Sequence, residues 1–320
     1  MEPLDTQILP PDDEGLHRAV QILRGGGLVA FPTETVYGLG ADARDDQAVA
    51  GIYAAKGRPD FNPLIVHVAD VATARRFARF SPEAERLAAA FWPGPLTLVL
   101  PLRDDAGLSP RVTAGLTSVA LRVPAHPVAQ ALLRAYDGPL AAPSANPSGR
   151  VSPTCAAHVA EGLGGRIHAI VEGGDCPVGV ESTIVELLDR PVLLRPGGVP
   201  HEVLEACLGH PLAALGDEVA QPSAPGQLAS HYAPGACVRL GVTRPEADEV
   251  WIGFGPASAT APFNLSPTGD LTEAAARLFA LLRAADAAAA QGRIAVAPVP
   301  QHGLGRAIND RLRRAAAPRP

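Results

Sequence analysis

The chain has 320 residues, of which 47% are hydrophobic, and its formal net charge is −6. This composition predicts one large or two smaller globular domains, which excludes a disordered chain, and the charge disfavours a broad basic surface for nucleic acid. The cysteines form no CxxC pair, which argues against a structural zinc site and a disulfide framework and favours a reducing cytosol: Cys155, Cys176, Cys207 and Cys237.

The N-terminal stretch MEPLDTQILPPDDEG is acidic and broken by prolines, so it does not resemble a signal peptide. No apolar run in the sequence reaches the length that spans a membrane. We therefore expect a cytoplasmic protein without membrane contact.

Helices and strands are predicted to interleave over the first two thirds of the chain. The first helix is amphipathic, with Leu16, Val20 and Leu23 on one face. Ser81 and Pro82 form a helix start, because serine caps the helix and proline at the first position loses no hydrogen bond. In chain order we expect helix 12–27, strand 28–33, helix 46–57, strand 63–68, helix 81–92, strands 96–102 and 118–124, helix 126–136, strand 140–144, helix 152–165 with the same start at Ser152, strands 168–174, 182–187 and 191–197, and helix 200–209.

The sequence texture changes near residue 210, where a stretch rich in proline, glycine and serine predicts a linker. Strands over 237–242, 249–255 and 293–299, a long alanine-rich helix from about Asp270 and a last helix over 304–316 follow. The class is therefore α/β, with a mixed sheet because consecutive strands occur near both ends of the first region. We expect three parts: a catalytic domain over 1–209, an interdomain linker over 210–235 and a small α/β domain over 236–320.

Common catalytic templates are absent from the sequence. It contains no GxxxxGK[ST] phosphate loop, no GxSxG, no HExxH and no GxGxxG after a predicted strand. A nucleotide, if one is bound, must be held by another kind of site.

Polar side chains instead gather where strands meet helices and turns. Thr33, Glu34, Thr35 and Tyr37 lie between a strand and a glycine-marked turn. They could simply cap a helix, and the local pattern favours neither this reading nor a ligand site.

Lys56 is the sole lysine in the chain, and it lies near Arg58 and Asn62 on a loop broken by glycine and prolines. The simpler interpretation is that the two cations merely offset the negative end of the preceding helix. A compact ammonium on a rigid, donor-rich loop also suits phosphate oxygens, where the wide guanidinium of arginine would not fit.

Two titratable side chains interrupt strands that otherwise look buried. His67 in PLIVHV is most simply a core histidine. Arg122 in VALRVP requires an anionic partner, either a protein carboxylate or a ligand, because an unpaired buried charge is costly.

Hydroxyl and amide groups also follow several strands. Ser144, Asn146 and Ser148 lie in APSANPSG, Ser182 opens a strand, and Arg195 ends one. Each alone could belong to an ordinary turn. Together, at the edge of an α/β sheet where ligands bind, they favour positioning and charge neutralisation of a polyphosphate over covalent catalysis.

Seven segments occur in a specific order: FPTETVYGLG, KGRPDFNPL, FWPGPLT, VALRVP, APSANPSG, VGVESTIVE and LRPGG. This set, which spans about residues 13–208, resembles the YrdC-like family of L-threonylcarbamoyladenylate synthases. The linker and the second α/β domain resemble the long, two-domain form of that family. The resemblance implies a twisted sheet wrapped by helices around a large cavity, followed by a Rossmann-like C-terminal domain.

The resemblance also implies a nucleotidyltransferase reaction. L-Threonine, bicarbonate and ATP, accompanied by Mg²⁺, would give L-threonylcarbamoyl-AMP and pyrophosphate. The product would supply the t⁶A modification at position 37 of tRNAs that read codons beginning with A, and a separate threonylcarbamoyl-transfer complex would complete it. We expect no protein side chains dedicated to a metal and no stable binding of nucleic acid.

The KxR and SxN signature of the family matches four residues, which the resemblance implies are catalytic: Lys56, Arg58, Ser144 and Asn146. The residues implied for ATP are Arg58, Asn62, Ser118, Ser144, Asn146, Ser152, Arg195, His231 and Tyr232. Those implied for threonine are Thr35, His67, Arg122, Ala142 and Ser182. The anion that Arg122 requires would then be the substrate carboxylate.

The linker departs from the family pattern. Members commonly read SPGMKYRHYAP, whereas this chain reads SAPGQLASHYAP from Ser223 to Pro234 and lacks the lysine, the first tyrosine and the arginine. His231 and Tyr232 are kept. The missing cations predict a looser hold on ATP or slower turnover.

Three rival functions are less consistent with this sequence. A double-stranded RNA-binding module of the same fold is disfavoured by the net charge, since such binding depends on neutralising phosphates. Carbamoyl transfer in hydrogenase maturation belongs to a longer protein with zinc-finger cysteine clusters. A degenerate enzyme fused to a C-terminal regulator is disfavoured by the intact signature.

Overall fold

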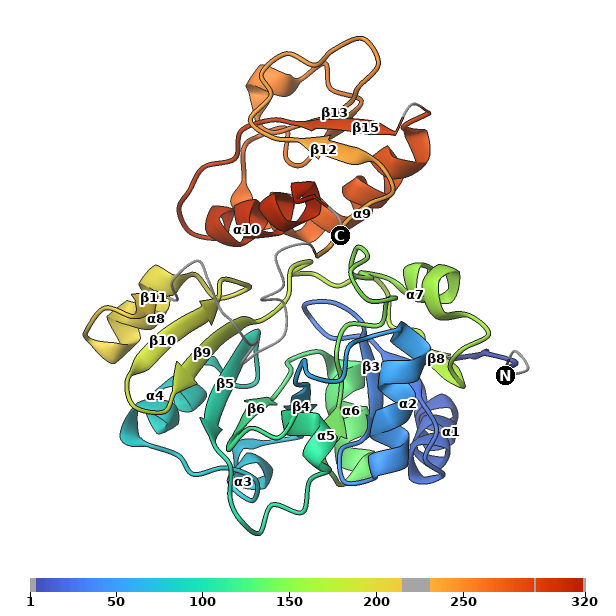
Figure 1. Ribbon diagram of the computed structural model, residues 1–320, viewed down its shortest axis with the longest axis vertical. Helices are drawn as coiled ribbons and strands as arrows, with labels where there is room; N and C mark the ends of the chain where they lie inside the picture. Colours follow the sequence, from blue (N-terminus) through green and yellow to red (C-terminus); the bar gives the residue numbers. More distant parts are fainter. Residues whose placement is uncertain (1–3, 215–230, 291, 319–320) are drawn as a thin grey trace.

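The computed structural model describes residues 4–214, 231–290 and 292–318. Within these residues the strands form one large sheet and one small sheet, and the small C-terminal sheet is stacked above the large one in Figure 1. The predicted α/β class is confirmed.

The large sheet is mixed, as predicted. Strands β4 and β6 pair in parallel, whereas β5 and β6 pair antiparallel. Its eleven described strands follow the order β1-β8-β2-β3-β7-β4-β6-β5-β9-β10-β11. Their bounds are β1 Gln7–Leu9, β2 Val29–Phe31, β3 Gly38–Asp42, β4 Ile65–His67, β5 Leu96–Pro101, β6 Ser118–Arg122, β7 Leu140–Ala141, β8 Ala169–Val171, β9 Thr183–Leu187, β10 Pro191–Arg195 and β11 Ala213–Ala214.

Helices flank this sheet, and their caps agree with the sequence in several places. The Ser81 hydroxyl accepts from the Ala84 N–H, and Pro82 is the first helical residue of α4. The helices are α1 Asp13–Arg24, α2 Asp46–Lys56, α3 Val71–Ala74, α4 Pro82–Phe91, α5 Pro110–Thr113, α6 Pro127–Tyr136, α7 Ala156–Leu163 and α8 His201–Leu208.

Two local expectations are corrected. The helix predicted over 152–165 begins only at Ala156, and Ser152 does not cap it, because its hydroxyl donates to Glu181 instead. The polar segment 33–37 does not cap a helix either, since strand β3 follows it. Glycines in β3 weakened the strand signal there, and the sequence analysis missed this element.

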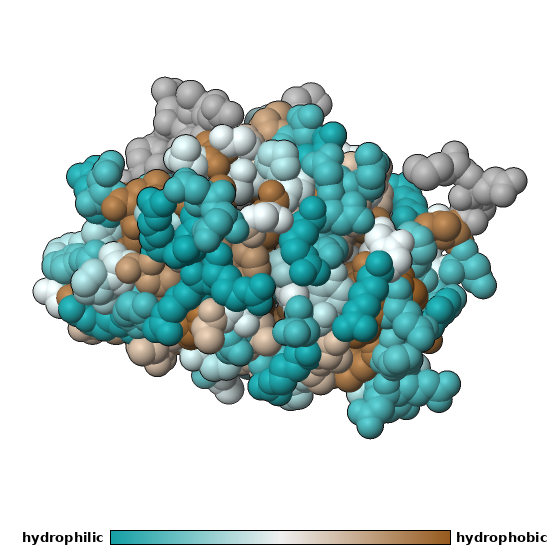
Figure 2. All heavy atoms as spheres, turned by 90° about the horizontal axis from the view of Figure 1, so that it is seen from below, coloured by the Kyte–Doolittle hydropathy of each residue, from teal (hydrophilic) through white to brown (hydrophobic). Residues whose placement is uncertain are grey.

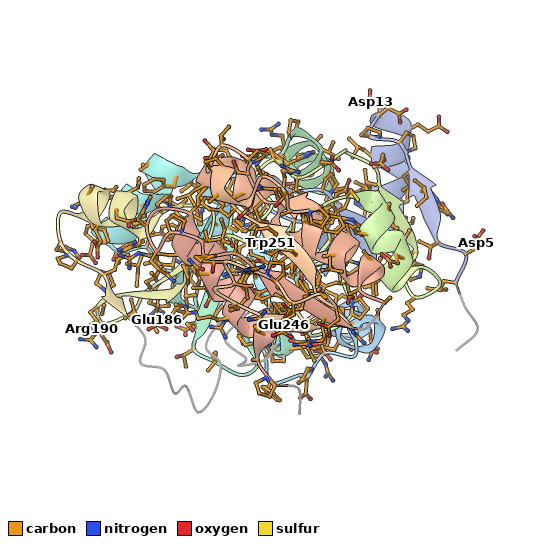
Figure 3. All side chains as sticks on the ribbon, turned by 90° about the horizontal axis from the view of Figure 1, so that it is seen from above. Asp5, Asp13, Glu186, Arg190, Glu246 and Trp251 are labelled. Carbon is orange, nitrogen blue, oxygen red and sulfur yellow. The ribbon has the colours of Figure 1, made fainter. Side chains whose placement is uncertain are left out.

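The C-terminal unit is a parallel sheet in the order β12-β15-β13-β14, with bounds β12 Cys237–Arg239, β13 Val250–Gly253, β14 Phe263–Asn264 and β15 Arg293–Val296. Helices α9 Leu271–Ala288 and α10 Gly305–Ala316 lie on the side of this sheet that faces the larger unit (Figure 1). In Figure 3, Glu246 and Trp251 of this unit lie over the middle of the molecule, whereas Glu186 and Arg190 mark the outer end of the β9–β10 hairpin.

The hydrophobic core of the C-terminal unit includes side chains from the larger one. Val36, Val151 and Val180 belong to the same buried cluster as Leu278 and Phe279 of α9. The two units therefore share apolar packing rather than touching only through polar surface.

The predicted linker over 210–235 lies within the described residues only at its two ends. At one end Ala213 and Ala214 form β11, which pairs in parallel with β10, although no strand was predicted there. At the other end lie His231 and Tyr232, both buried. Residues 215–230 lie outside the described residues.

The surface seen from below in Figure 2 is mostly hydrophilic, with hydrophobic residues scattered among the polar ones. Among the described residues, no helix combines the length and the apolar character that crossing a membrane requires.

Candidate functional site

A pocket lies at the polar edge that the sequence analysis predicted, with about 530 Å³ of space not filled by protein atoms, part of it open to solvent. It receives residues from the large sheet, from the loops that follow the strands and from the end of the interdomain segment. The residues that line it are Thr33, Thr35, Val36, Gly38, Arg58, Ile65, His67, Arg122, Ala142, Pro143, Ser144, Glu181, Ser182, Arg195, His231 and Tyr232.

The sheet brings two of these side chains together by register. His67 ends β4 and Arg122 ends β6, and the two are direct partners in a parallel pair. Side chains two residues apart on a strand share a face, so Ile65 and Ala120 lie on the same face and form part of a small apolar cluster. Of these two residues Ile65 lines the pocket, so it places an apolar side chain beside the polar strand ends.

Arg122 has a protein carboxylate beside it. Its Nη2 lies 2.8 Å from Oε1 of Glu34, and both side chains are buried. The pair is not aligned as a hydrogen bond, so neither atom has a hydrogen-bond partner among the described residues. The anion that the sequence analysis required is Glu34 in this structure, and Nη2 still has a donor to offer.

His67 is held without a charge. Its Nδ1 lies 3.3 Å from the Ile65 carbonyl oxygen, and its ring meets the edge of Phe31. Burial, with a further contribution from Arg122, lowers the pKa of His67 to about 3. The imidazole is therefore neutral at pH 7.

Lys56 points inward and fastens the loop that carries Ser144 and Asn146. Its Nζ donates to the carbonyl oxygens of both residues at 2.5 Å, and the side chain is only 3% exposed. Burial, and then the neighbouring Arg58, lower the pKa of Lys56 well below its usual value. Lys56 is not one of the residues that line the pocket, so it acts on the site from behind this loop.

Arg58 follows the left-handed residue that ends α2. Gly57 has φ 60°, and Arg58 then turns back so that Nη2 donates to the Pro63 carbonyl oxygen at 3.0 Å. Burial lowers the pKa of Arg58 to about 10, so the guanidinium remains charged at pH 7. Asn62 lies in the same loop, and its buried Oδ1 has no hydrogen-bond partner among the described residues.

Asn146 shapes its own loop. Its Nδ2 donates to the carbonyl oxygens of Pro147 and Arg150, while its buried Oδ1 lacks a partner within the described chain. Ser144 lines the pocket, as does Ala142. The loop thus places one hydroxyl at the pocket, with the amide of Asn146 behind it.

Ser182 and Arg195 form another part of the pocket wall, where they contact each other. Arg195 donates from Nε and Nη2 to the Ser182 carbonyl oxygen, and Nη2 lies 3.2 Å from its hydroxyl oxygen. The Ser182 hydroxyl also lies 2.7 Å from that of Thr97. Burial lowers the pKa of Arg195.

The structure places some predicted residues away from the pocket wall. Ser118 begins β6, four residues before Arg122, and Asn62, Asn146 and Ser152 do not line the pocket either. Ser152 is nevertheless tied to the wall, because its hydroxyl donates to Oε1 of Glu181 at 2.6 Å.

Glu181 is a charged residue of the pocket that was not predicted, although it lies within the motif VGVESTIVEL. Its Oε2 pairs with Nε of Arg311 from α10 at 2.7 Å. Nothing in the sequence singles out Arg311 as part of the site, because the last helix carries several arginines and only the fold shows which one is buried. A carboxylate directly before a buried strand was the available signal for Glu181.

His231 and Tyr232 both reach the pocket. Tyr232 adopts φ 60°, its ring stacks on Phe279 of α9, and His231 packs against it with ring centroids 4.1 Å apart. Burial, and then the surrounding cations Arg58 and Lys56, keep the pKa of His231 well below its usual value.

The donors around the pocket suit phosphate and carboxylate oxygens better than a resident metal. Within the described residues, no group of three or more His, Cys, Asp or Glu side chains could hold a metal ion. Guanidinium groups, hydroxyls and a neutral imidazole dominate instead.

Two family models divide the chain between them. One, described as telomere recombination and covering Sua5, YciO and YrdC proteins, matches residues 21–197. The other, described as the C-terminal domain of threonylcarbamoyl-AMP synthase, matches residues 199–317.

Individual proteins are similar over most of the chain. The threonylcarbamoyl-AMP synthase of Bacillus subtilis is 51% identical over 245 residues, covering 75% of this chain and 70% of that protein. The enzyme of Pyrococcus abyssi is 45% identical over 322 residues, covering 93% of each. The crystal structure of P. abyssi Sua5 complexed with L-threonine has a TM-score of 0.89 and 41% identity, covering 97% of this chain and 98% of that one.

Proposed function

Because the chain belongs to the Sua5/YrdC family, in its two-domain Sua5 form, we propose that its pocket joins ATP, L-threonine and bicarbonate. Its activity is that of a threonylcarbamoyl-AMP synthase, a nucleotidyltransferase. The observation that carries the site assignment is the meeting of Arg58, Arg122 and Arg195 with hydroxyl groups in one pocket.

The proposed chemistry has two steps. The threonine amine first attacks the carbon of bicarbonate, and loss of water gives a carbamate. A carbamate oxygen then attacks the α-phosphorus of ATP in line, and the bond to the β-phosphate oxygen breaks so that pyrophosphate leaves with the electron pair. Negative charge on the leaving and equatorial oxygens is the quantity that the protein must stabilise.

Threonine is proposed to occupy the strand-end side of the pocket. Nη2 of Arg122, which is ion-paired with Glu34 but makes no hydrogen bond among the described residues, suits the threonine carboxylate, and the neutral His67 can hydrogen-bond without adding a second cation. Thr35 and Ser182 supply hydroxyls, and Ala142 closes the wall beside them. A site that hydrogen-bonds the substrate hydroxyl discriminates strongly against an apolar isostere.

ATP is proposed to occupy the side bounded by Arg58, Ser144 and Arg195, with His231 covering it. The two guanidinium groups are buried and charged, so they neutralise phosphate oxygens at little cost in reorganisation. Lys56 and Asn146 act from behind by fixing the Ser144 loop, while the roles of Asn62 and Ser118 in holding ATP remain our proposal.

Mg²⁺ is proposed to enter as part of the MgATP substrate. The described residues offer it no carboxylate cluster, whereas the phosphate oxygens of ATP provide the hard ligands that it prefers. When bound there, it would supply further neutralisation of the transferred phosphoryl group.

The product is proposed to pass to a tRNA-modifying complex that transfers the threonylcarbamoyl group to position 37 of tRNAs reading codons that begin with A. We place this reaction in the cytosol, where the four free cysteines would stay reduced.

The test is to incubate the protein with MgATP, L-threonine and labelled bicarbonate and to separate the products. We expect a labelled, AMP-linked product and pyrophosphate, both requiring all three substrates. Serine or valine in place of threonine should react more slowly. Failure to form the AMP-linked product would overturn the proposed reaction, and equal rates with valine would remove the role given to the hydroxyl groups.

A further inference from the structure

Arg311 of α10 is a fully buried arginine that reaches from the C-terminal unit into the wall of the pocket. Its Nε lies 2.7 Å from Glu181, and its Nη1 donates to the Pro196 carbonyl oxygen at 2.9 Å and to Asp310 at 2.7 Å. A guanidinium can hold several oxygens at once in fixed directions, which an ammonium cannot.

The Glu181 carboxylate links Arg311 to Ser152. One carboxylate oxygen pairs with Arg311, and the other accepts the Ser152 hydroxyl hydrogen at 2.6 Å. A serine hydroxyl has a single hydrogen, so this bond fixes the direction of the Ser152 hydroxyl, which is fully buried behind the pocket wall. Both oxygens of Glu181 are therefore held by the protein, one by Arg311 and one by Ser152.

Arg311 also packs against the segment that covers the pocket. Its guanidinium carbon lies 5.1 Å from the centre of the Tyr232 ring, which also contacts the rings of Phe279 and His231. Tyr232 holds a left-handed backbone conformation, φ 60°, which a residue with a side chain keeps only when its surroundings fix it.

We propose that Arg311 is a positioning residue for the nucleotide: it holds Glu181 and Tyr232, which both line the pocket, in the positions that ATP binding requires. This inference rests on the proposed binding of ATP in this pocket. It gives the C-terminal unit a direct part in binding, through one side chain.

Removing Arg311 changes the protonation of Glu181. Burial raises the pKa of this carboxyl, and Arg311 followed by Arg195 outweighs burial and holds the pKa below its usual range. Without Arg311, the nearest charge that favours the ionised carboxylate is lost, so the pKa of Glu181 should rise. The other groups that act on this carboxyl are Ser152, Arg195 and Tyr232, and Asp310 is the second carboxylate paired with Arg311.

The experiment measures kcat and the KM for ATP from pyrophosphate release at several pH values. For Arg311→Met we expect the KM for ATP to rise about tenfold near pH 7 while kcat changes less than about threefold. The KM of Arg311→Met should fall as the pH is raised, because a higher pH favours the ionised Glu181, whereas the KM of the unaltered enzyme should stay flat. Arg311→Lys, which keeps the charge, should raise the KM by about threefold without this pH dependence.

Arg306→Met is the matched control. Arg306 lies on the same helix and pairs with Glu202 of the larger unit at 3.6 Å, but its side chain is 49% exposed. We expect its KM and kcat to stay within about twofold of the unaltered enzyme. If Arg311→Met does not fold, Arg311→Lys takes its place, and a KM for ATP equal to that of the unaltered enzyme would then overturn the role of Arg311.

Ser152→Ala tests the predicted assignment of Ser152 to ATP separately from the role of Arg311. An unchanged KM for ATP in Ser152→Ala would overturn the assignment of Ser152 to the nucleotide. A raised KM in Ser152→Ala with an unchanged KM in Arg311→Met, or a loss in Arg311→Met confined to kcat, would overturn the role of Arg311 alone. A pH-independent rise in Arg311→Met that Arg306→Met reproduces would show a merely structural effect and would also overturn it.

Discussion

At the scale of single residues, Lys56 shows why a lysine is kept in a chain that otherwise uses arginine. Its ammonium fits between two carbonyl oxygens, 2.5 Å from each, in a space closed to solvent. A thin stem and a compact charge meet this requirement, whereas a planar guanidinium is too wide. The sequence predicts that this cation neutralises the transferred phosphate, and the structure shows that its ammonium binds the carbonyl oxygens of Ser144 and Asn146.

Lys56→Ala should abolish the pyrophosphate release that depends on threonine and bicarbonate. Lys56→Arg should lower kcat/KM by at least about a hundredfold, because the wider group displaces Ser144 and Asn146 from their positions. The measurement is steady-state pyrophosphate release, with melting temperature as the control for folding. Normal turnover of Lys56→Arg would contradict the steric explanation.

His67 should make stability depend on pH in the acid range. The unfolded chain takes up a proton at the ordinary pKa of about 6.5, whereas the folded imidazole resists protonation down to about 3. The unfolded state therefore binds more protons between these values, and the free energy of unfolding falls as the pH is lowered from 6.5 towards 3. The neutral His67 therefore makes its full contribution to the free energy of unfolding above pH 6.5.

The comparison of the unaltered protein with His67→Gln isolates this effect, because all other groups titrate in both. Between about pH 6.5 and pH 5, the stability difference between the two should move by about 2 kcal/mol in favour of His67→Gln. Urea unfolding at the two pH values measures it. A difference that stays constant with pH would mean that His67 is readily protonated in the folded state.

At the scale of elements, the end of α2 sets the direction of the loop that carries Arg58. Gly57 adopts φ 60°, and a methyl group added to it would meet no atom within 4 Å. The cost of Gly57→Ala is therefore backbone strain alone, and we expect a loss of about 1 kcal/mol in the free energy of unfolding. Chemical denaturation measures it.

Gly51→Ala, inside the same helix, is the matched control, and it should change the free energy of unfolding in the opposite direction. A methyl group there would make ordinary contacts with Leu28, the nearest at 3.5 Å, so Gly51→Ala should stabilise the protein by roughly 0.5–1 kcal/mol. Equal effects of the two substitutions would show that the left-handed conformation of Gly57 does not decide its stability.

The sequence predicted elements well where periodicity and caps agree. Helix α4, with its Ser81 cap, and the paired strands β5 and β6 were found within a few residues. Elements of one turn or a few residues, such as α5 and β11, are decided by tertiary packing and leave little or no periodic signal. Strand β3 was missed for another reason, because its glycines weaken the strand propensity.

The site was predictable to a similar degree. Arg58, Arg122 and Arg195 stood out because each is a charge beside a buried strand or a broken loop, and all three line the pocket. The Glu34 and Arg311 pairings could not be read from the chain, because each joins residues far apart in sequence. Local patterns locate charged side chains, whereas the fold decides which charges meet.

At the scale of the whole molecule, the contact between the two units depends on a close backbone approach. Gly179, with φ 73°, packs against α9, and the adjacent Val180 joins the shared hydrophobic core. A methyl group on Gly179 would lie 2.4 Å from the Ala276 Cα and 2.5 Å from the Ala275 carbonyl oxygen. Because these are backbone atoms of a helix, they cannot turn aside as a side chain would.

Gly179→Ala should therefore push the units apart, with a loss of about 2–3 kcal/mol beyond the strain of the backbone conformation itself. Gly174→Ala is the matched control, since Gly174 has φ 75° and open space around it, so it carries the strain without the clash. Separation would also break the Arg311–Glu181 pair, so the KM for ATP should rise in Gly179→Ala and not in Gly174→Ala. Calorimetric unfolding and the KM for ATP, measured on both variants, decide the matter: equal losses in the two would mean that the units do not depend on this contact.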